Sequence, residues 1–352
     1  MTQARLADHL IQALRAWGIT HAQTACLPAL VQEFVDTDDA AAPALAVDPQ
    51  IVPANVRSLL VCPTHDIAEP SLIASVRFPD TGMDIDASAL NAAFDCAVIE
   101  TLAEAELGAF QTETDLRDAL KQRLARCHGY RGLAFPIYVA AGHRSAQPHP
   151  VPSATHHKLI GPFLVDAGIH GDTVTTDVSR TLLAPDASAR QRRIYTLVLK
   201  ALVRASMTTS AETEHLQSAA LPILQQDGYR MPHGLGHMVL PGLAVHGPQP
   251  IFGTQTTTLP DGTHFTLEPG HYTAGDFGVR LENLLQMRHR SPRTLTHIPL
   301  DVRRTYPGLL TAAEKNWVQN YNNLCLTRRA PMLSSAAMKW CSNASRWPDG
   351  YN

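Results

Sequence analysis

The segment from Phe163 to Leu182, FLVDAGIHGDTVTTDVSRTL, constrains the fold more than any other part of the sequence. Its apolar beginning predicts a buried strand that ends at Asp166, and the β-branched run Thr173–Thr176 predicts a return strand that carries Asp177. A hairpin of this kind brings Asp166 and Asp177 side by side, and two adjacent carboxylates repel each other unless a cation lies between them. The alternative interpretation is a pair of solvated turn aspartates.

A second segment, from His264 to Met287, repeats this pattern, with a strand leading to Glu268 and a return strand leading to Glu282. His233 and His237 lie between the two segments in the glycine-rich sequence HGLGH. Four carboxylates and one imidazole match the charge of two divalent cations, and oxygen-rich ligation with one nitrogen suits Mn²⁺, Co²⁺ or Zn²⁺. The two segments together therefore predict a metal site with two ions.

Composition narrows the class of protein. The chain has 352 residues, of which 45% are hydrophobic and 17% charged, as in an ordinary globular protein. A net charge of −3 gives no reason to expect a nucleic acid or an anionic membrane as partner. No apolar run approaches the roughly 18 residues that cross a bilayer, and the N-terminus lacks the apolar core of a secretory signal. The six scattered cysteines lack a CxxC pair, so we expect reduced thiols in a cytoplasmic protein.

Helical periodicity and capping residues predict the remaining elements. Ser88 is the expected N-cap of one helix, while Thr112 with Asp115 and Thr311 with Glu314 form expected capping boxes. We expect a strand at 133–141, a polar loop at 142–152, and helices at 5–17, 88–107, 112–127, about 194–205, 214–226 and from 312 onwards. The order of these elements predicts two similar halves that bring their hairpins together.

With these residues in this order, the chain resembles the metallopeptidases of the pita-bread fold, which include methionine aminopeptidase, prolidase, creatinase and aminopeptidase P. The family's ligand pattern of D-x-G, D, H, E and E is matched in turn by Asp166, Asp177, His237, Glu268 and Glu282. The steps of eleven residues between the aspartates and fourteen between the glutamates also fit. The resemblance implies an α+β pita-bread fold with pseudo-twofold αββ halves.

Within this family the chain is most similar to the cytosolic-type Xaa-Pro aminopeptidases. Thr175–Thr181 matches their return strand, His246 follows His237 by nine residues, and Pro299–Asn322 resembles their C-terminal region. The resemblance implies a short, truncated N-terminal region at 1–87, a catalytic domain at 88–305 and a C-terminal extension at 306–352. It also implies a homodimer, with an exposed Trp317 in the docking region.

The resemblance further implies how the site residues would work. His237 and Glu268 would bind one ion and Asp166 the other, while Asp177 and Glu282 would bridge both. Mn²⁺ is the first choice of metal, with Co²⁺ or Zn²⁺ as alternatives. A water molecule activated by the ions would attack the scissile carbonyl, and Glu268 would carry its proton to the leaving amine.

Three histidines and one arginine complete the implied site. His149 would contact the substrate, His246 would stabilise the oxyanion or carry protons, and His233 would line the pocket for the leaving residue. Arg280 would be a partner of the carboxylates. The implied substrate is a short peptide with proline second, cleaved after its first residue.

Two departures from the family pattern leave other functions open. Met238 and Leu240 stand where the family has glycines, and we expect their bulk to narrow the substrate space. The glutamate that follows the equivalent of His246 in the family is missing. An Xaa-Pro dipeptidase, a hydrolase of a small non-peptide substrate and a catalytically impaired scaffold therefore remain alternatives.

Overall fold

The computed structural model describes residues 45–47, 64–66, 86–150, 157–171, 174–225, 228–229, 231–239, 245, 252 and 256–348. In the two short ranges before residue 86, strand β1 (Leu45–Val47) pairs in parallel with β2 (Thr64–Asp66). The helix predicted at 5–17, and the residues Leu240 and His246, lie outside the described residues.

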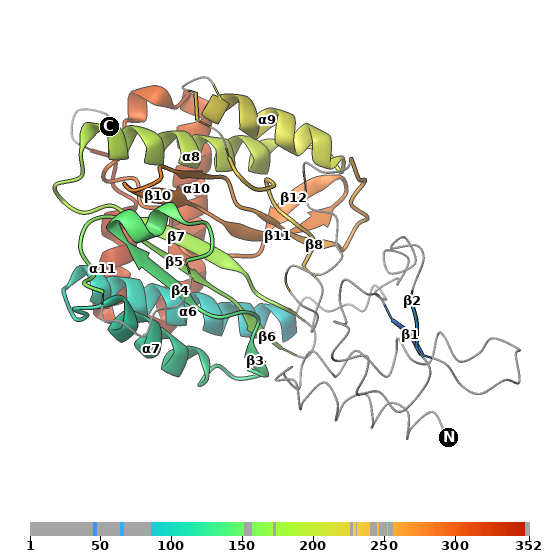
Figure 1. The fold of residues 1–352 in the computed structure, drawn as a ribbon, viewed down its shortest axis with the longest axis horizontal. Coiled ribbons are helices and arrows are strands. Elements are labelled where there is room, and N and C mark those ends of the chain that lie inside the picture. The colour runs from blue at the N-terminus through green and yellow to red at the C-terminus, as the bar shows by residue number, and fades with distance from the viewer. Residues whose placement is uncertain are drawn as a thin grey trace, which may run out of the picture.

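The first half of the fold is a helix pair followed by an antiparallel sheet with the order β4-β5-β7. Its elements are α6 (Asp86–Glu106), α7 (Glu113–Leu124), β3 (Gly132–Leu133), β4 (Tyr138–Ala141), the 3-10 helix η1 (Gly142–Ala146), β5 (Phe163–Ala167), β6 (Ile169–His170) and β7 (Val178–Leu182). The helices α6 and α7 lie together on one side of these strands (Figure 1).

The second half repeats this arrangement with a sheet of order β12-β11-β8. Its elements are α8 (Ala189–Met207), α9 (Thr213–Gln225), β8 (His264–Leu267), β9 (Gly270–Tyr272), β10 (Gly278–Arg280), β11 (Asn283–Arg288) and β12 (Ser291–Thr294). The chain then forms η2 (Pro307–Leu309), α10 (Ala312–Arg329), η3 (Ala330–Met332) and α11 (Ser335–Ala344). The prediction of two similar halves is confirmed, with α8 and α9 on the side of the strands opposite to α6 and α7 (Figure 1).

Four local predictions differ from the structure. Helix α6 begins at Asp86, so Ser88 lies inside it and is not its N-cap. The strand predicted at 133–141 is divided into β3 and β4, and Pro136, which has no amide hydrogen to donate, lies between them. The return strand of the first hairpin begins only at Val178, because the Thr176 amide and hydroxyl bond to Ile169 and close the turn instead. The predicted polar loop after β4 begins as η1.

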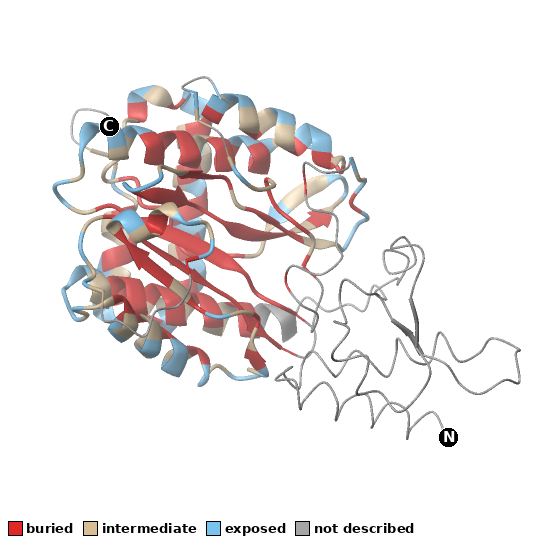
Figure 2. Ribbon diagram, in the orientation of Figure 1, coloured by how far each residue is buried: buried red, intermediate tan, exposed pale blue. Residues whose placement is uncertain are grey.

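Each half of the fold is built around its own apolar core. The strands between the helix pairs are almost wholly buried (Figure 2). The first core joins α6 and α7 to β4, β5 and β7, and the second joins α8 and α9 to β8, β10 and β11. A fully buried side chain such as Phe94 or Phe265 contributes about 2 kcal/mol to folding. The described helices include none that is long and apolar enough to cross a membrane.

The C-terminal helices pack into both cores. Helix α10 contributes Val318 and Tyr321 to the second core, and α11 contributes Trp340 to the first. The capping boxes predicted at Thr112 and Thr311 are confirmed. The expectation of an exposed Trp317 is wrong: this side chain is partly buried, and its ring stacks on Tyr321 with 5.3 Å between the ring centroids.

Candidate metal centre

Strand register places two carboxylates at the same end of each hairpin. In the first hairpin Asp166 pairs with Ser179 and Ala167 pairs with Val178, so Asp177 lies one residue beyond the last pair. In the second hairpin Leu267 pairs with Asn283. Glu268 and Glu282 therefore flank that last pair, and each hairpin presents two carboxylates beside each other.

The two hairpins are joined at these ends through Ser179. The amide of Glu282 donates to the Ser179 carbonyl at 3.0 Å, and the Ser179 hydroxyl donates to Glu282 Oε2 at 2.7 Å. Arg280 Nε donates to the same hydroxyl oxygen at 2.8 Å. The carboxylates of the second hairpin are thereby fixed against the strand that follows Asp177.

His237 reaches the carboxylates from the edge of β8. Thr266 N donates to the His237 carbonyl at 2.8 Å, and His237 N donates to Thr266 Oγ1 at 3.1 Å. The preceding Gly236 is required, because a Cβ there would lie 1.9 Å from the Thr266 carbonyl oxygen. This close approach explains the second glycine of the HGLGH sequence.

The tautomer of His237 is set by its neighbour. Its Nδ1 lies 3.1 Å from the Met238 carbonyl oxygen, which can only accept, so Nδ1 carries the hydrogen. Nε2 then presents a lone pair in the neutral ring, 3.6 Å from Asp177 Oδ2 and 3.5 Å from Glu268 Oε1. This is the protonation state that a metal ligand requires.

The donor atoms of Asp177, His237 and Glu282 all lie within 4.8 Å of one another, and the three residues are buried. Asp166 adjoins them. Its Oδ2 accepts a hydrogen bond from Arg280 Nη2 at 2.5 Å, while its buried Oδ1 has no hydrogen-bond partner among the described residues. A buried, unpartnered carboxylate oxygen beside carboxylate and imidazole donors fits a divalent cation. The predicted role of Arg280 as a partner of the carboxylates is confirmed.

Crowding and burial disfavour the ionised forms of these carboxyls. Burial, and then the charges of Glu282 and Asp166, raise the pKa of Asp177 well above its usual range. Burial and the charge of Glu268 do the same to the pKa of Glu282. Burial raises the pKa of Glu268 to about 7, although the Arg280 guanidinium opposes this shift. Bound divalent cations would lower these pKa values again by stabilising the ionised forms.

The three predicted substrate histidines differ in position. His149 is exposed, its ring centroid lies 5.9 Å from that of Tyr138, and partial burial together with Arg280 lowers its pKa. His233 Nε2 lies 2.9 Å from the Tyr272 hydroxyl, which in turn accepts from Arg280 Nη1 at 2.8 Å. His233 is therefore linked to the carboxylate cluster, whereas His246 lies outside the described residues.

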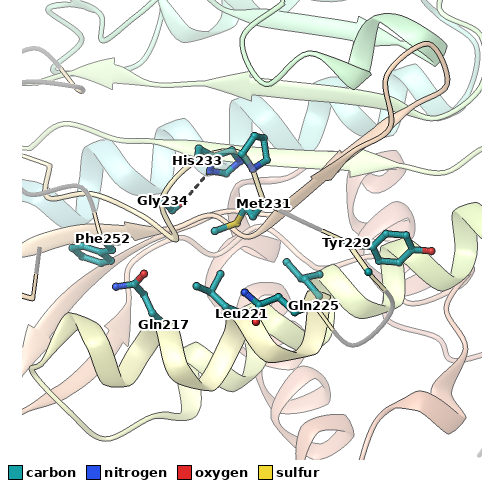
Figure 3. Close-up of a pocket in the computed structure, with 11 residues that line it drawn as sticks. Gln217, Leu221, Gln225, Tyr229, Met231, His233, Gly234 and Phe252 are labelled. Carbon is teal, nitrogen blue, oxygen red and sulfur yellow. Dashed lines mark hydrogen bonds between the residues drawn. The ribbon is translucent and has the colours of Figure 1, made fainter. Parts of the chain in front are cut away.

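His233 also lines a pocket of about 870 Å³ beside α9 (Figure 3). Gln217, Leu221 and Gln225 project from α9 into this pocket, and Met231 faces them from the loop that carries His233. Glutamine amides and apolar side chains in one pocket can contact both the backbone and the side chain of a short peptide.

Sequence reasoning missed Ser179 and Tyr272, which hold the charged groups in place. Ser179 could have been found, because it lies two residues after Asp177 and so shares its side of an extended chain. Met238 was expected to narrow the substrate space, but its side chain packs against the second core, because neighbouring side chains of an extended segment point in opposite directions.

Comparisons with known proteins agree with this geometry. The model of metallopeptidase family M24 matches residues 82–289. Aminopeptidase P1 of Lotus japonicus is 31% identical over 255 residues, which are 66% of this chain and 39% of that protein. A probable Xaa-Pro aminopeptidase P of Tuber melanosporum is 31% identical over 60% of this chain and 38% of its own length. This chain thus spans about two fifths of the length of these curated relatives.

Solved structures with the same fold include an X-prolyl aminopeptidase from Caenorhabditis elegans, described as a cytosolic enzyme with a di-nuclear active site. It superposes with a TM-score of 0.67 at 26% identity, over 74% of this chain and 47% of that one. An X-Pro aminopeptidase from Thermotoga maritima shares the fold alone, with a TM-score of 0.54 at 20% identity over 83% of this chain and 98% of that one.

Fold and site together define a metallopeptidase of the pita-bread class, and the predicted α+β pita-bread fold is confirmed. The chain belongs to metallopeptidase family M24.

Proposed function

We propose that this chain removes the first residue from short peptides whose second residue is proline, as a metal-dependent Xaa-Pro aminopeptidase. The observation that carries the proposal is the buried grouping of Asp177, His237 and Glu282, with donor atoms within 4.8 Å of one another, in a chain of this family. Asp166 and Glu268 adjoin the group, which supports a five-residue ligand set for two divalent ions.

In this proposal Asp166, Asp177, His237, Glu268 and Glu282 would hold the two ions, with His237 and Glu268 serving one ion, Asp166 the other, and Asp177 and Glu282 both. Two bound divalent cations would lower the pKa of a water molecule and polarise the scissile carbonyl. Mn²⁺ is the proposed metal, with Co²⁺ and Zn²⁺ as alternatives that the same donors accept.

The chain's own residues would supply the proton transfer and the orientation of the peptide. Glu268, whose Oε1 lies 3.5 Å from His237 Nε2, would accept a proton from the attacking water and return it to the leaving amine. His149 would contact the substrate, and His246 would stabilise the oxyanion or carry protons. His233, which lines the pocket beside α9, would contact the leaving part of the peptide.

The test is a Mn²⁺-supplemented screen of Xaa-Pro, Xaa-Pro-Yaa and Xaa-Ala-Yaa peptides, with Glu268→Ala as the blank. Release of the first residue from Xaa-Pro-Yaa peptides only, absent in the blank, is the expected result. Cleavage of Xaa-Pro alone would instead identify a dipeptidase, and equal cleavage of the alanine series a broader peptidase. No cleavage by a protein that holds two ions would contradict the proposal and favour a non-peptide substrate or a scaffold.

We also propose that the protein is a cytoplasmic homodimer. Leu324 on α10 and Met332 on η3 are 42% and 52% exposed, which supports an apolar contact through the C-terminal region. The four cysteines that the structure describes are free thiols, as in a reducing compartment. A monomer in sedimentation at micromolar concentration would contradict the dimer, and secretion of the tagged chain would contradict the compartment.

A further inference from the structure

The buried Arg180 connects the candidate metal centre to the C-terminal part of the chain. Its Nη1 donates to the carbonyl of Ser179 at 3.0 Å and to the carbonyl of Glu282. Its Nη2 donates to Asn283 Oδ1 and to the Ile298 carbonyl, both at 2.7 Å. One guanidinium thus holds the strand that follows Asp177 and the residue proposed as a bridging ligand.

Tyr321 of α10 closes this group from the other side. Its hydroxyl oxygen accepts from Arg180 Nη2 at 3.2 Å and lies 2.9 Å from the Ile298 carbonyl oxygen. The same hydroxyl lies 3.1 Å from the Thr296 carbonyl oxygen and 3.3 Å from Asn283 Oδ1. Because the Tyr321 hydroxyl has one hydrogen, it donates to one of these oxygens at a time while its oxygen accepts a hydrogen bond from Arg180.

Glu282 is consequently fixed at two points. The Ser179 hydroxyl holds its carboxylate at 2.7 Å, and Arg180 holds its main-chain carbonyl. The planar guanidinium presents its donors in a rigid fork, so its orientation sets the position of the backbone that carries the carboxylate. Tyr321 contributes to that orientation from 141 residues away in the sequence.

We propose that Arg180 and Tyr321 are positioning residues for Glu282 as a metal ligand, an inference that rests on the proposed function. Helix α10 is then part of the metal centre, although none of its residues contacts the carboxylates in the described structure. Groups that orient a metal ligand typically change metal affinity by about 10–100-fold when they are removed.

Tyr321→Phe is the informative variant because it preserves the ring. The stacking on Trp317 at 5.3 Å remains, and Arg180 Nη2 still has Asn283 and Ile298 as acceptors, so the fold is retained. Tyr306→Phe is the matched control. Tyr306 packs its ring under the Arg192 guanidinium at 4.7 Å and takes no part in the hydrogen bonds around Arg180 that the structure describes.

The experiment measures Mn²⁺ affinity of the full chain by competition with a chromophoric chelator, together with far-UV circular dichroism. Tyr321→Phe should bind Mn²⁺ about tenfold more weakly with unchanged stoichiometry and spectrum. Arg180→Lys, which loses the fork, should weaken binding further, and Tyr306→Phe should match the wild type. If Arg180→Lys does not fold, Tyr321→Phe decides alone.

Unchanged affinity in Tyr321→Phe, or an equal loss in Tyr306→Phe, would overturn the positioning role while the proposed function stands. A wild-type chain that binds no Mn²⁺ would overturn the proposed function, and this inference with it.

Discussion

Two buried acidic clusters in this protein differ in how their charge is compensated. In the first, Asp95 on α6 accepts from Arg329 Nη2 at 2.7 Å and from the His297 amide at 2.9 Å. In the second, the candidate metal centre, four carboxylates share one ion-paired cation among the described residues, Arg280, which contacts Asp166. The Asp95 cluster is complete as it stands, whereas the second has an excess of carboxylates.

Charge compensation distinguishes a structural ion pair from a candidate ligand site. Burial raises the pKa of Asp95 to about 6 in spite of Arg329, and it raises the pKa of Asp177 and Glu282 well above their usual range. In the first case Arg329 forms an ion pair with the single carboxylate of Asp95, which joins α10 to α6. In the second the excess negative charge is removed by protonation of the carboxyls when metal is absent, or matched by divalent cations when they bind. The following variants test that distinction.

Replacing a proposed bridging ligand should have the largest effect. Asp177→Asn should lose both ions and reduce activity by about a thousandfold, which corresponds to about 4 kcal/mol of the barrier. In the metal-free protein this substitution should change the free energy of unfolding by no more than about 1 kcal/mol, because asparagine resembles the protonated carboxyl. Elemental analysis, peptidase assays and urea unfolding measure the three quantities. Two ions retained by Asp177→Asn would remove Asp177 from the ligand set.

The corresponding change in the Asp95 cluster should act on stability instead. Asp95→Ala removes the carboxyl that accepts from Arg329 and from the His297 amide, leaves both buried donors without that acceptor, and should reduce the free energy of unfolding by about 3 kcal/mol. Urea unfolding with and without Mn²⁺ should give the same loss. A loss that depended on Mn²⁺ would show that the two clusters are coupled.

The pH dependence of the free energy of unfolding should also distinguish the two clusters. The pKa of Glu268 is raised from 4.5 to about 7, so the native state holds a proton that the unfolded state has released between these values. In the metal-free protein the free energy of unfolding should therefore fall by about 3 kcal/mol as pH rises through this window. Bound Mn²⁺ should abolish this fall, because metal binding favours the deprotonated ligands.

The contribution of Asp95, whose pKa rises from 3.8 to about 6, should decline with pH in the same direction whether or not metal is present. Urea unfolding between pH 4.5 and pH 7.5, with chelator and with Mn²⁺, measures both contributions. The same pH dependence of the free energy of unfolding with chelator and with Mn²⁺ would contradict the distinction between the clusters.

The smallest effect is expected from the hydroxyl that joins the two hairpins. Ser179→Ala removes the donor to Glu282 and the acceptor for Arg280 Nε, and should weaken Mn²⁺ binding about tenfold. Ser345→Ala, which loses a hydroxyl that in the described part of the chain donates to the Cys341 carbonyl of α11, is the control. Equal affinities for the two variants would show that Ser179 does not orient the ligand.

Local sequence chemistry was sufficient to predict most elements of the described fold. The capping boxes at Thr112 and Thr311 fix the beginnings of α7 and α10, because the residues that satisfy each other are three positions apart. The start of α6 and the break between β3 and β4 were predicted wrongly. At the break, Pro136 interrupts the chain locally, and β3 pairs with the distant β6 instead of continuing into β4.

The sequence alone predicts the candidate ligand residues and their order, because alternating strands and the spacing of Asp166, Asp177, Glu268 and Glu282 already place two carboxylates on each hairpin. How the two hairpins meet depends on contacts between residues that are far apart in the sequence. The ion pair between Arg280 and Asp166 spans 114 residues, and the bond between Arg180 and Tyr321 spans 141. No periodicity reports such contacts, because they arise when the two cores bring the sheets and α10 together.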